Sequence, residues 1–359
     1  MSENEMQRIR RRRGPSTMAP ESRDLPVSTI ARMSSPSVLH VNDAAFTAER
    51  MISEANSRGL DWTLLPKAAP AQEWRGITGR ARRVAIGGAW VARLAVAARR
   101  HDIVHVHSAS TLAHSRLGAP RYVVHCHGTD VRTAQYDSTR RASIVDGLLR
   151  AEAVLYSTPD LAEHVLVHRP DAVYLPVPID VDAVPEWAPA DTPRVVFASR
   201  WSPDKGVETQ LAVARDLAAR FGDLVDVVGL DWGPCAHEAV AAGVRLVPRS
   251  GHSDYLALLA GASVVVGQSA GILAASELEA LAAGAPVVVP TQLPLYDDPP
   301  VTAVDPSDAA DAVDAVLRGA RAGWHDAAER REWTRKFHGV VSAVDTVTKL
   351  HDSVLSARG

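Results

Sequence analysis

Cysteine and long apolar runs are scarce in this chain, and it has almost no net charge. Its 359 residues include two cysteines, Cys126 and Cys235, which excludes a disulfide framework and a four-cysteine zinc site and favours a cytosolic protein. No stretch approaches the roughly 18–20 continuous apolar residues of a membrane-spanning helix. A formal net charge of −3 gives no reason to expect nucleic acid as a partner.

Two common nucleotide-binding motifs are also missing. No Gly-x-Gly-x-x-Gly follows a predicted strand, which disfavours a nicotinamide or flavin enzyme. The Gly-x4-Gly-Lys-Ser/Thr phosphate loop does not occur either. What remains is a chain that is 46% hydrophobic and 23% charged, which predicts a folded globular protein with room for two domains.

Residues 1–36 differ from the rest of the chain. They contain Arg8 and the run from Arg10 to Arg13, with scattered Pro and Ser and no hydrophobic periodicity, so we predict a disordered basic tail. No apolar stretch follows the arginines, which argues against a secretory signal. The tail is either an electrostatic anchor for anionic lipid or acidic partners, or an upstream translation of a chain that starts near Met33.

From Ser37 onward, short β-rich runs alternate with helical patterns. Several runs are continuously apolar, as expected for parallel strands that are covered on both faces. The first series of predicted strands comprises residues 38–41, 62–65, 103–107, 122–127, 154–157 and 173–175. The second series comprises residues 195–198, 225–228, 244–247, 263–266 and 286–289.

A segment rich in Pro and polar residues, 185–193, separates the two series. We therefore predict an α/β protein with a Rossmann-like domain at 37–184, a linker at 185–193, a second Rossmann-like domain at 194–322, and one or two long helices at 323–359. Doubly wound sheets bind ligands beyond the carboxyl ends of their strands, and a cleft between two domains is the usual ligand site.

Two cations follow the first strand of the second series. Arg200 stands at the strand exit, and Lys205 lies in the turn that leads into the next helix. Lysine is rare here, with Lys67, Lys336 and Lys349 as the other three. Cations beside a helix N-terminus suit a phosphate or diphosphate, although Ser-Pro-Asp-Lys-Gly is also an ordinary surface turn.

A loop of small residues, 269–275, enters a helix that carries Glu277 and Glu279. The loop backbone is suited to approach a phosphate, and one carboxylate of the helix is suited to accept both hydroxyls of a ribose. Residues two apart on a helix are separated by about 200°, so at most one of the two glutamates points at a ligand. Alternatively, Ser276 and Glu279 form a capping box that serves only the helix end.

Two histidine pairs stand on neighbouring strands. His105 and His107 flank one residue, as do His125 and His127, which precedes Gly128-Thr129-Asp130. Residues two apart on a strand face the same way. The pairs could hold a metal ion, place His127 against a substrate, or be structural, with Asp130 as a helix cap.

Residues 75–100 are rich in arginine. A basic helix that bears tryptophan can lie on an anionic membrane surface, but it is more often a solvated face. The residues concerned are Arg75, Arg80, Arg82, Arg83, Arg93, Arg99 and Arg100, together with Trp74 and Trp90.

Taken together, these segments resemble the retaining, nucleotide-sugar-dependent glycosyltransferases of family 4, over about residues 37–320. Arg200 and Lys205-Gly206 match the Arg…Lys-Gly segment of that family. Residues 276–288 match its Leu-Glu-Ala-Met-Ala-x-Gly-x-Pro-Val-Val block. Residues 127–130 are similar to its His-Gly-x-Asp turn, and residues 175–180 to its Pro-Asn-x-Val-Asp segment before the interdomain linker.

The resemblance implies a GT-B fold, in which two Rossmann-like domains face each other across a cleft and the last helices cross back onto the first domain. It also implies roles for single residues. Arg200 and Lys205 would hold the donor diphosphate, and Glu279 would bind the ribose hydroxyls. His127 would lie near the donor sugar.

The donor loop departs from the family pattern. Gly271 stands where the family usually has a glutamate, and Gly271, Ile272 and Leu273 replace the first residues of its Glu-Gly-Phe-Gly loop. We count these three residues among the donor-binding candidates, and His107 and Asp130 as candidate contacts to sugar or acceptor. The loop at 43–50 lacks the Gly-Gly that is common in the family. The sugar is therefore not specified by the resemblance.

The expected reaction moves a hexosyl unit from a nucleoside-diphosphate sugar to an acceptor hydroxyl, with retained anomeric configuration. Arg200, Lys205 and loop N–H groups would stabilise the leaving diphosphate in place of a divalent metal, so neither a metal nor a cofactor is expected. We expect the protein in the cytoplasm, with or without contact to the inner membrane face through residues 75–100. The alternatives are a catalytically impaired GT-B homologue that binds a nucleotide sugar or a partner, and a metal-dependent hydrolase built on the histidine pairs.

Overall fold

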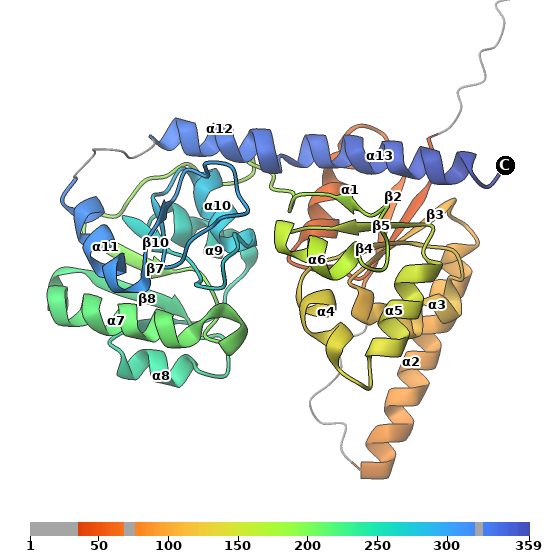
Figure 1. The fold of residues 1–359 in the computed structure, drawn as a ribbon, viewed down its shortest axis with the longest axis horizontal. Coiled ribbons are helices and arrows are strands. Elements are labelled where there is room, and N and C mark those ends of the chain that lie inside the picture. Colours follow the sequence, from red (N-terminus) through yellow and green to blue (C-terminus); the bar gives the residue numbers. More distant parts are fainter. Residues whose placement is uncertain (1–34, 68–75, 320–325) are drawn as a thin grey trace, which may run out of the picture. The chain divides into compact units, whose positions relative to one another are not determined.

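The computed structural model describes residues 35–67, 76–319 and 326–359. The predicted basic tail, apart from its last two residues, and the pair Trp74-Arg75 lie outside the described residues. The chain from Ser35 onward forms a single unit by its internal contacts. Its two halves each contain one parallel sheet (Figure 1).

The first sheet has six parallel strands in the order β2-β1-β3-β4-β5-β6. Alternate strand residues enter two separate hydrophobic cores, because successive side chains point to opposite faces. The strands are β1 (Val38–Val41), β2 (Trp62–Leu65), β3 (Ile103–His107), β4 (Val123–Cys126), β5 (Ala153–Tyr156) and β6 (Val173–Tyr174). The helices are α1 (Thr47–Ser57), α2 (Gly76–Ala98), α3 (Leu112–Gly118), α4 (Thr129–Arg132), α5 (Arg141–Arg150) and α6 (Ala162–Val165).

The second sheet also has six parallel strands, in the order β12-β11-β10-β7-β8-β9. This is the order of a doubly wound sheet, and the strand order reverses between β7 and β10. The strands are β7 (Arg194–Phe197), β8 (Asp226–Leu230), β9 (Arg245–Val247), β10 (Val264–Val266), β11 (Val287–Val289) and β12 (Thr302–Ala303). The helices are α7 (Val207–Phe221), α8 (Ala236–Ala241), α9 (His252–Ala260), α10 (Ala275–Ala283) and α11 (Ala309–Leu317).

Two further helices end the chain, α12 (Ala327–His338) and α13 (Val340–Ser356). Helix α12 packs against α10 of the second half, and α13 packs against α1 of the first half. The two helices meet at Gly339, which forms a bridge with Ile179. The C-terminal helices therefore contact both halves, as the resemblance implied.

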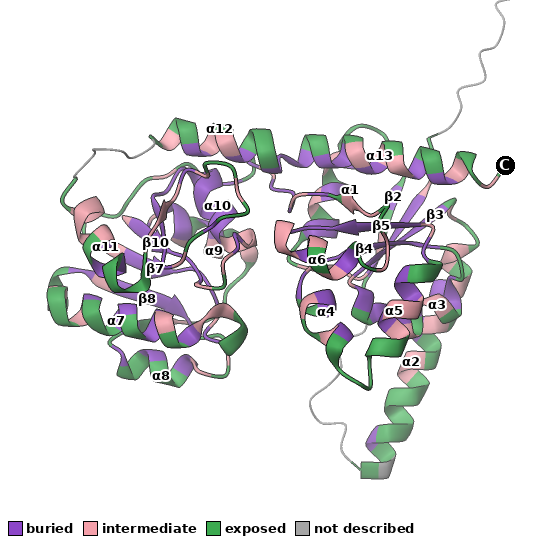
Figure 2. Cartoon of the chain, viewed as in Figure 1, coloured by how far each residue is buried: buried purple, intermediate pink, exposed green. Residues whose placement is uncertain are grey.

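Burial explains why these segments fold as they do. The central strands of both sheets are buried along nearly their whole length, the edge strands are buried in part, and most helices bury one face and expose the other (Figure 2). Valine-rich strands such as β10 and β11 are buried at every residue, as the continuous apolar runs predicted. The predicted α/β class with two parallel sheets is confirmed, and every predicted strand is found with ends shifted by no more than two residues.

Helix α2 does not present Trp90 to a membrane. Trp90 is buried in the first core and donates its indole N–H to the carbonyl oxygen of Pro66 at 2.9 Å. Most of the described arginines of this helix are exposed. No helix in the described part of the chain is both long and apolar enough to cross a bilayer.

Candidate functional site

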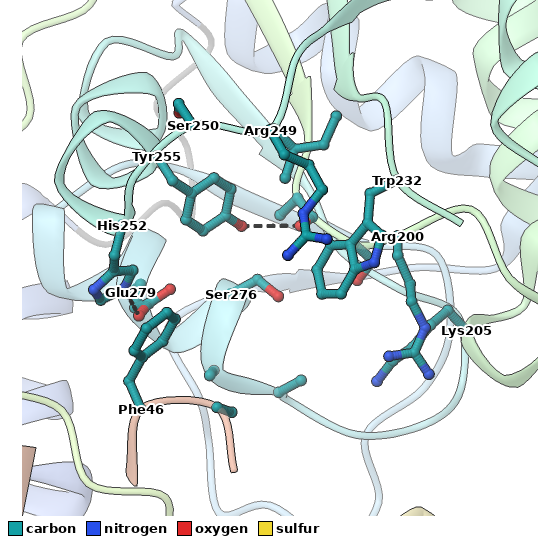
Figure 3. A pocket seen from close by; sticks show the side chains of 16 residues that line it. Phe46, Arg200, Lys205, Trp232, Arg249, Ser250, His252, Tyr255, Ser276 and Glu279 are labelled. Carbon is teal, nitrogen blue, oxygen red and sulfur yellow. Dashed lines mark hydrogen bonds and ion pairs between the residues drawn. The ribbon is translucent and has the colours of Figure 1, made fainter. Parts of the chain in front are cut away.

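A pocket of about 260 Å³ opens at the carboxyl ends of the second sheet's strands (Figure 3). It lies where the strand order reverses, which is the position that doubly wound sheets use for ligands. Arg200 follows β7, Trp232 follows β8 and Arg249 follows β9. Phe46, from the loop before α1, completes the wall from the first half of the chain.

Arg200 and Lys205 are held by the turn that the sequence predicted. The turn consists of a short 3₁₀ segment, Pro203–Lys205, and Gly206, whose φ of 69° lies in the left-handed region that favours glycine. A Cβ at Gly206 would lie 2.0 Å from the Oγ of Ser269. The absence of a side chain therefore lets the turn approach the loop that follows β10.

The two cations differ in their partners. Arg200 forms an ion pair with Asp204, and its guanidinium lies 5.8 Å from the ring centroid of Trp232. Burial lowers the pKa of Lys205, and among the described residues no carboxylate lies within ion-pair distance of its ammonium. A half-buried ammonium without an ion-pair partner favours an anionic ligand in the same pocket.

Arg249 adds a third cation that the sequence reasoning missed. Its guanidinium lies 4.8 Å from the ring centroid of Trp232, so the indole stands between two arginines. Figure 3 shows Arg200, Lys205 and Arg249 around Trp232, and His252, Glu279 and Phe46 across the pocket. Because Arg249 also follows a predicted strand at its carboxyl end, the rule that selected Arg200 could have selected it too.

The two glutamates of α10 have different roles. Glu277 is fully buried and accepts hydrogen bonds from the hydroxyl of Ser199 and the backbone N–H groups of Gln268 and Ala274. It thereby ties the exits of β7 and β10 to the start of α10. Glu279 instead lines the pocket, so only one of the two faces it.

The alternative capping box of Ser276 with Glu279 is not formed. Helix α10 starts at Ala275, so Ser276 lies inside the helix. Glu277 accepts from the N–H of Ala274 and serves the helix start, while the methyl group of Ala274 has no atom that could accept in return.

Glu279 binds side chains from both halves of the chain. Its Oε1 forms an ion pair with Arg50 and lies 2.7 Å from the Nε2 of His252. Arg50 also donates to the carbonyl oxygens of Ala45 and Pro178, at 3.2 and 3.1 Å. The ring of Phe46 stacks on His252 with a centroid distance of 4.1 Å. Sequence reasoning did not find this cluster, because its members lie up to 229 residues apart.

A second pocket of about 280 Å³ adjoins the first and shares Arg200 and Lys205 with it. Ile272 lines it, whereas Leu273 is buried and donates its backbone N–H to the hydroxyl of Tyr296 at 3.0 Å. Gly271 has a φ of 74° and open space where a side chain would be. The donor-loop candidates therefore differ in how close they come to the pockets.

His127 and Asp130 line the second pocket. Asp130 is buried, and its carboxylate accepts backbone N–H groups of Ala109, His127, Gly128 and Val131. These bonds fix the turn after β4. The carboxylate thus has a structural function that does not depend on a ligand.

The ring of His127 is held from both sides. Its Nε2 lies 3.0 Å from the Nδ1 of His107, and its Nδ1 lies 3.3 Å from the Oγ of Ser157. Burial lowers the pKa of His127 to about 4, so the ring is neutral at pH 7. His107 is fully buried behind it and lines neither pocket, so its contact to sugar or acceptor stays a prediction.

The hydrolase alternative finds no site in the described residues. His105, His107 and His125 lie together, but all three are fully buried. Hydrolysis needs water and substrate at the metal, and these side chains line neither of the two pockets around Lys205.

No family model and no curated protein sequence matches the chain. Solved structures do match. Anabaena HepE in complex with UDP and glucose superposes with a TM-score of 0.64 at 13% identity, covering 89% of this chain and 100% of that chain. Sucrose-phosphate synthase from Thermosynechococcus elongatus gives 0.60 at 14% identity with the same coverage. AviGT4, a glycosyltransferase of avilamycin A biosynthesis, gives 0.58 at 18% identity and covers 89% and 98%. These similarities confirm the predicted two-domain, Rossmann-like GT-B fold.

Proposed function

We propose that the protein is a glycosyltransferase that moves a hexosyl unit from a nucleoside-diphosphate sugar to an acceptor hydroxyl, with retention and without a divalent metal. The observation that carries this proposal is the half-buried ammonium of Lys205, which has no ion-pair partner among the described residues and lies beside Arg200 in a pocket that also contains Glu279. The structure of HepE with UDP-glucose supports a nucleotide sugar as the ligand class.

In this mechanism the diphosphate binds where the two pockets meet, because Arg200 and Lys205 line both. Negative charge grows on the diphosphate as the glycosidic bond breaks, and fixed cations stabilise that charge without reorganisation. The nucleoside then occupies the first pocket, with its ribose at Glu279. The sugar occupies the second pocket near His127.

The proposed role of His127 is to position the sugar. Both of its ring nitrogens already have partners in the protein, so the ring presents one fixed orientation to the second pocket. Gly271 supplies no carboxylate to the sugar, which leaves the choice of sugar to the remaining walls of this pocket. The acceptor is an alcohol whose identity the two pockets do not specify.

The test is calorimetry with UDP, GDP, ADP and TDP sugars, followed by transfer assays with and without a chelator. A charge-assisted hydrogen bond contributes roughly 1.5–3 kcal/mol. Lys205→Ala should therefore weaken binding of the preferred nucleotide roughly 10- to 150-fold. The matched control is Lys336→Ala, because Lys336 is exposed on α12. Equal affinity in wild type and Lys205→Ala would remove Lys205 from the donor site.

A second candidate is a homologue that binds a nucleotide sugar but does not transfer it. Gly271, in place of the family's usual glutamate, favours this candidate, since its position has open space and no functional group. Tight nucleotide binding without turnover on any acceptor would support it. Measurable transfer that is lost in Lys205→Ala would exclude it.

The location of the protein stays a prediction. Both cysteines are free thiols, which fits the cytoplasmic location expected from the sequence. Cell fractionation would test this location, and flotation with anionic vesicles would test membrane contact through residues 75–100.

A further inference from the structure

A cluster of histidines occupies one face of the first sheet, and the proposed reaction uses only one of them, His127. Six of the 14 histidines of the chain belong to it. They are His40 on β1, His105 and His107 on β3, His125 on β4, His127 directly after β4, and His351 on α13. All except His127 have an exposed fraction of 0%.

Strand register brings these side chains together. His40 is paired with His105 between β1 and β3, and His107 with His125 between β3 and β4. The rings of His105 and His107 are stacked with a centroid distance of 4.7 Å. The ring of His125 lies 5.8 Å from that of His105 and 5.5 Å from that of His107.

Several ring nitrogens of the cluster are buried without a hydrogen-bond partner. They are Nε2 of His40, Nε2 of His105, both nitrogens of His125 and Nδ1 of His351. Buried polar atoms are nearly always paired in folded proteins. Five such atoms in one cluster indicate a ligand that several imidazoles bind together.

Hydrogen bonds fix which nitrogen of His107 carries the proton. The hydroxyl of Ser157 donates to the carbonyl oxygen of Cys126 at 2.8 Å, so the Nδ1–H of His127 must donate to Ser157. The Nε2 of the neutral His127 then accepts from the Nδ1–H of His107. The Nε2 of a neutral His107 therefore carries a lone pair, which accepts from His40 at 2.9 Å.

His105 offers the same arrangement. Its Nδ1 lies 3.2 Å from the Nε2 of His351, and its Nε2 has no partner. When Nδ1–H donates to His351, the Nε2 of His105 carries a lone pair. Metal-bound histidines typically donate their other N–H to an outer partner that fixes the tautomer. His127 and His351 are such partners for His107 and His105.

We propose that His105, His107 and His125 bind one copper(I) ion. One nitrogen of each ring can be chosen so that all three lie within 4.8 Å of one another, so small side-chain rotations would bring them onto one ion. At His107 the ion would replace the contact with His40. Nitrogen ligands of this type suit zinc and copper.

The charge of the surroundings favours a monovalent ion. The three ligands are neutral, and no carboxylate belongs to the described cluster. The carboxylate of Asp130 acts on His127, and the guanidinium of Arg358 acts on His351. Burying a divalent ion here without an anionic ligand would carry a much larger desolvation penalty than burying a monovalent one. None of the three ligands lines either pocket around Lys205, although His107 contacts His127 of the second pocket.

The test is an anaerobic titration of the full chain with copper(I) against a chromogenic chelator, with zinc(II) in a parallel arm. Copper is added to native protein and also during refolding, because the ligands are fully buried. Cys235→Ala is the background, since Cys235 is a partly exposed free thiol that would bind copper(I) by itself. The expected result is one copper(I) per chain, with zinc(II) weaker, and an absorption-edge spectrum that shows nitrogen ligands without sulfur.

His125→Leu should weaken copper(I) binding by more than about 100-fold and remove the copper-dependent rise in melting temperature. The matched control is His338→Leu, because His338 is buried outside the cluster. His105→Asn serves as the second ligand variant if His125→Leu does not fold. Absence of one-to-one copper(I) binding in both the native and refolded arms would overturn the proposal. So would tighter binding of zinc(II), or unchanged affinity in a folded ligand variant.

Discussion

Removal of the Arg50 side chain should destabilise the protein far more than removal of an ordinary surface arginine. Arg50 and Glu279 form an ion pair whose side chains are 9% and 4% exposed. Arg50→Ala leaves the carboxylate of Glu279 buried with His252 as its remaining partner. It also removes the donors to the carbonyl oxygens of Ala45 and Pro178.

The magnitude follows from burial. Removing one partner of a buried ion pair typically costs 3–5 kcal/mol, because the other charge stays buried. His252 still contacts Glu279, which reduces this cost, so we expect Arg50→Ala to lower the free energy of unfolding by about 3 kcal/mol. At about 2.1 cal/mol/K per residue, unfolding of 359 residues has an entropy of about 0.75 kcal/mol/K, so this corresponds to a fall in melting temperature of roughly 4 °C.

Urea unfolding of wild type, Arg50→Ala, Glu279→Gln and the double variant measures the effect and its origin. The coupling energy between the two side chains should be about 1.5–3 kcal/mol. Arg58→Ala is the matched control, since Arg58 directly follows α1 and forms more exposed ion pairs with Glu54 and Asp345. Such surface pairs contribute about 0.2–1 kcal/mol. The reasoning fails if Arg50→Ala costs no more than Arg58→Ala, or if the coupling energy is below about 0.5 kcal/mol.

Three further predictions follow from burial and backbone geometry. Burial lowers the pKa of His127 to about 4 and of His351 to about 3. Below the ordinary histidine pKa near 6.5 the unfolded chain therefore binds more protons than the folded chain. As the pH falls from 6.5 to about 4, each of these histidines should lower the free energy of unfolding by up to about 1.4 kcal/mol per pH unit. Thermal melts at pH 7.5, 6 and 5 check this, and a melting temperature independent of pH would contradict it. Gly206→Ala should destabilise the protein by about 1–2 kcal/mol and weaken nucleotide binding, because the added Cβ would lie 2.0 Å from the Oγ of Ser269. Urea unfolding measures the stability and calorimetry measures the binding. Wild-type values in both assays would contradict this prediction. Glu277→Gln replaces a carboxylate oxygen that accepts hydrogen bonds by an amide group that donates them. It should lower the free energy of unfolding in urea by about 2–3 kcal/mol. An unchanged unfolding midpoint would show that these hydrogen bonds contribute little.

Most of the fold could be predicted because the central strands are buried on both faces. A parallel strand between two layers of helices has to be apolar along its length, and runs such as 264–266 and 287–289 show this pattern clearly. The short edge strand β12, Thr302–Ala303, was missed because it is only two residues long and half-buried. It also has no large apolar residue, unlike Val173 and Tyr174 of the equally short β6, so the sequence signal for a strand is absent.

The site could be predicted only where its residues follow strands. Arg200 and Lys205 were found because the carboxyl ends of parallel strands are the expected ligand edge. Phe46 and Arg50 were not found, since they reach the second half through tertiary contacts with His252 and Glu279. No local pattern records such a contact.

The histidine cluster could also be predicted only in part. The pairs on β3 and β4 could be placed on one face by their spacing alone. His40 and His351 joined them only through the pairing of β1 with β3 and the packing of α13 on this half. Spacing predicts which way a side chain points, but it does not predict which strands become neighbours.

The carboxylates around the second pocket bear on the proposed stereochemistry. Two acidic side chains line it in the described structure, Asp130 and Asp204. Asp130 accepts backbone N–H groups, and Asp204 pairs with Arg200 and accepts from Ser202. A covalent glycosyl intermediate needs a carboxylate that is free to attack the sugar, and each of these is already engaged. This supports same-face substitution, in which the leaving diphosphate itself assists the acceptor. The barrier would then depend chiefly on how well the cations stabilise that diphosphate, so the loss of Lys205 should lower the rate of transfer as well as the affinity for the donor.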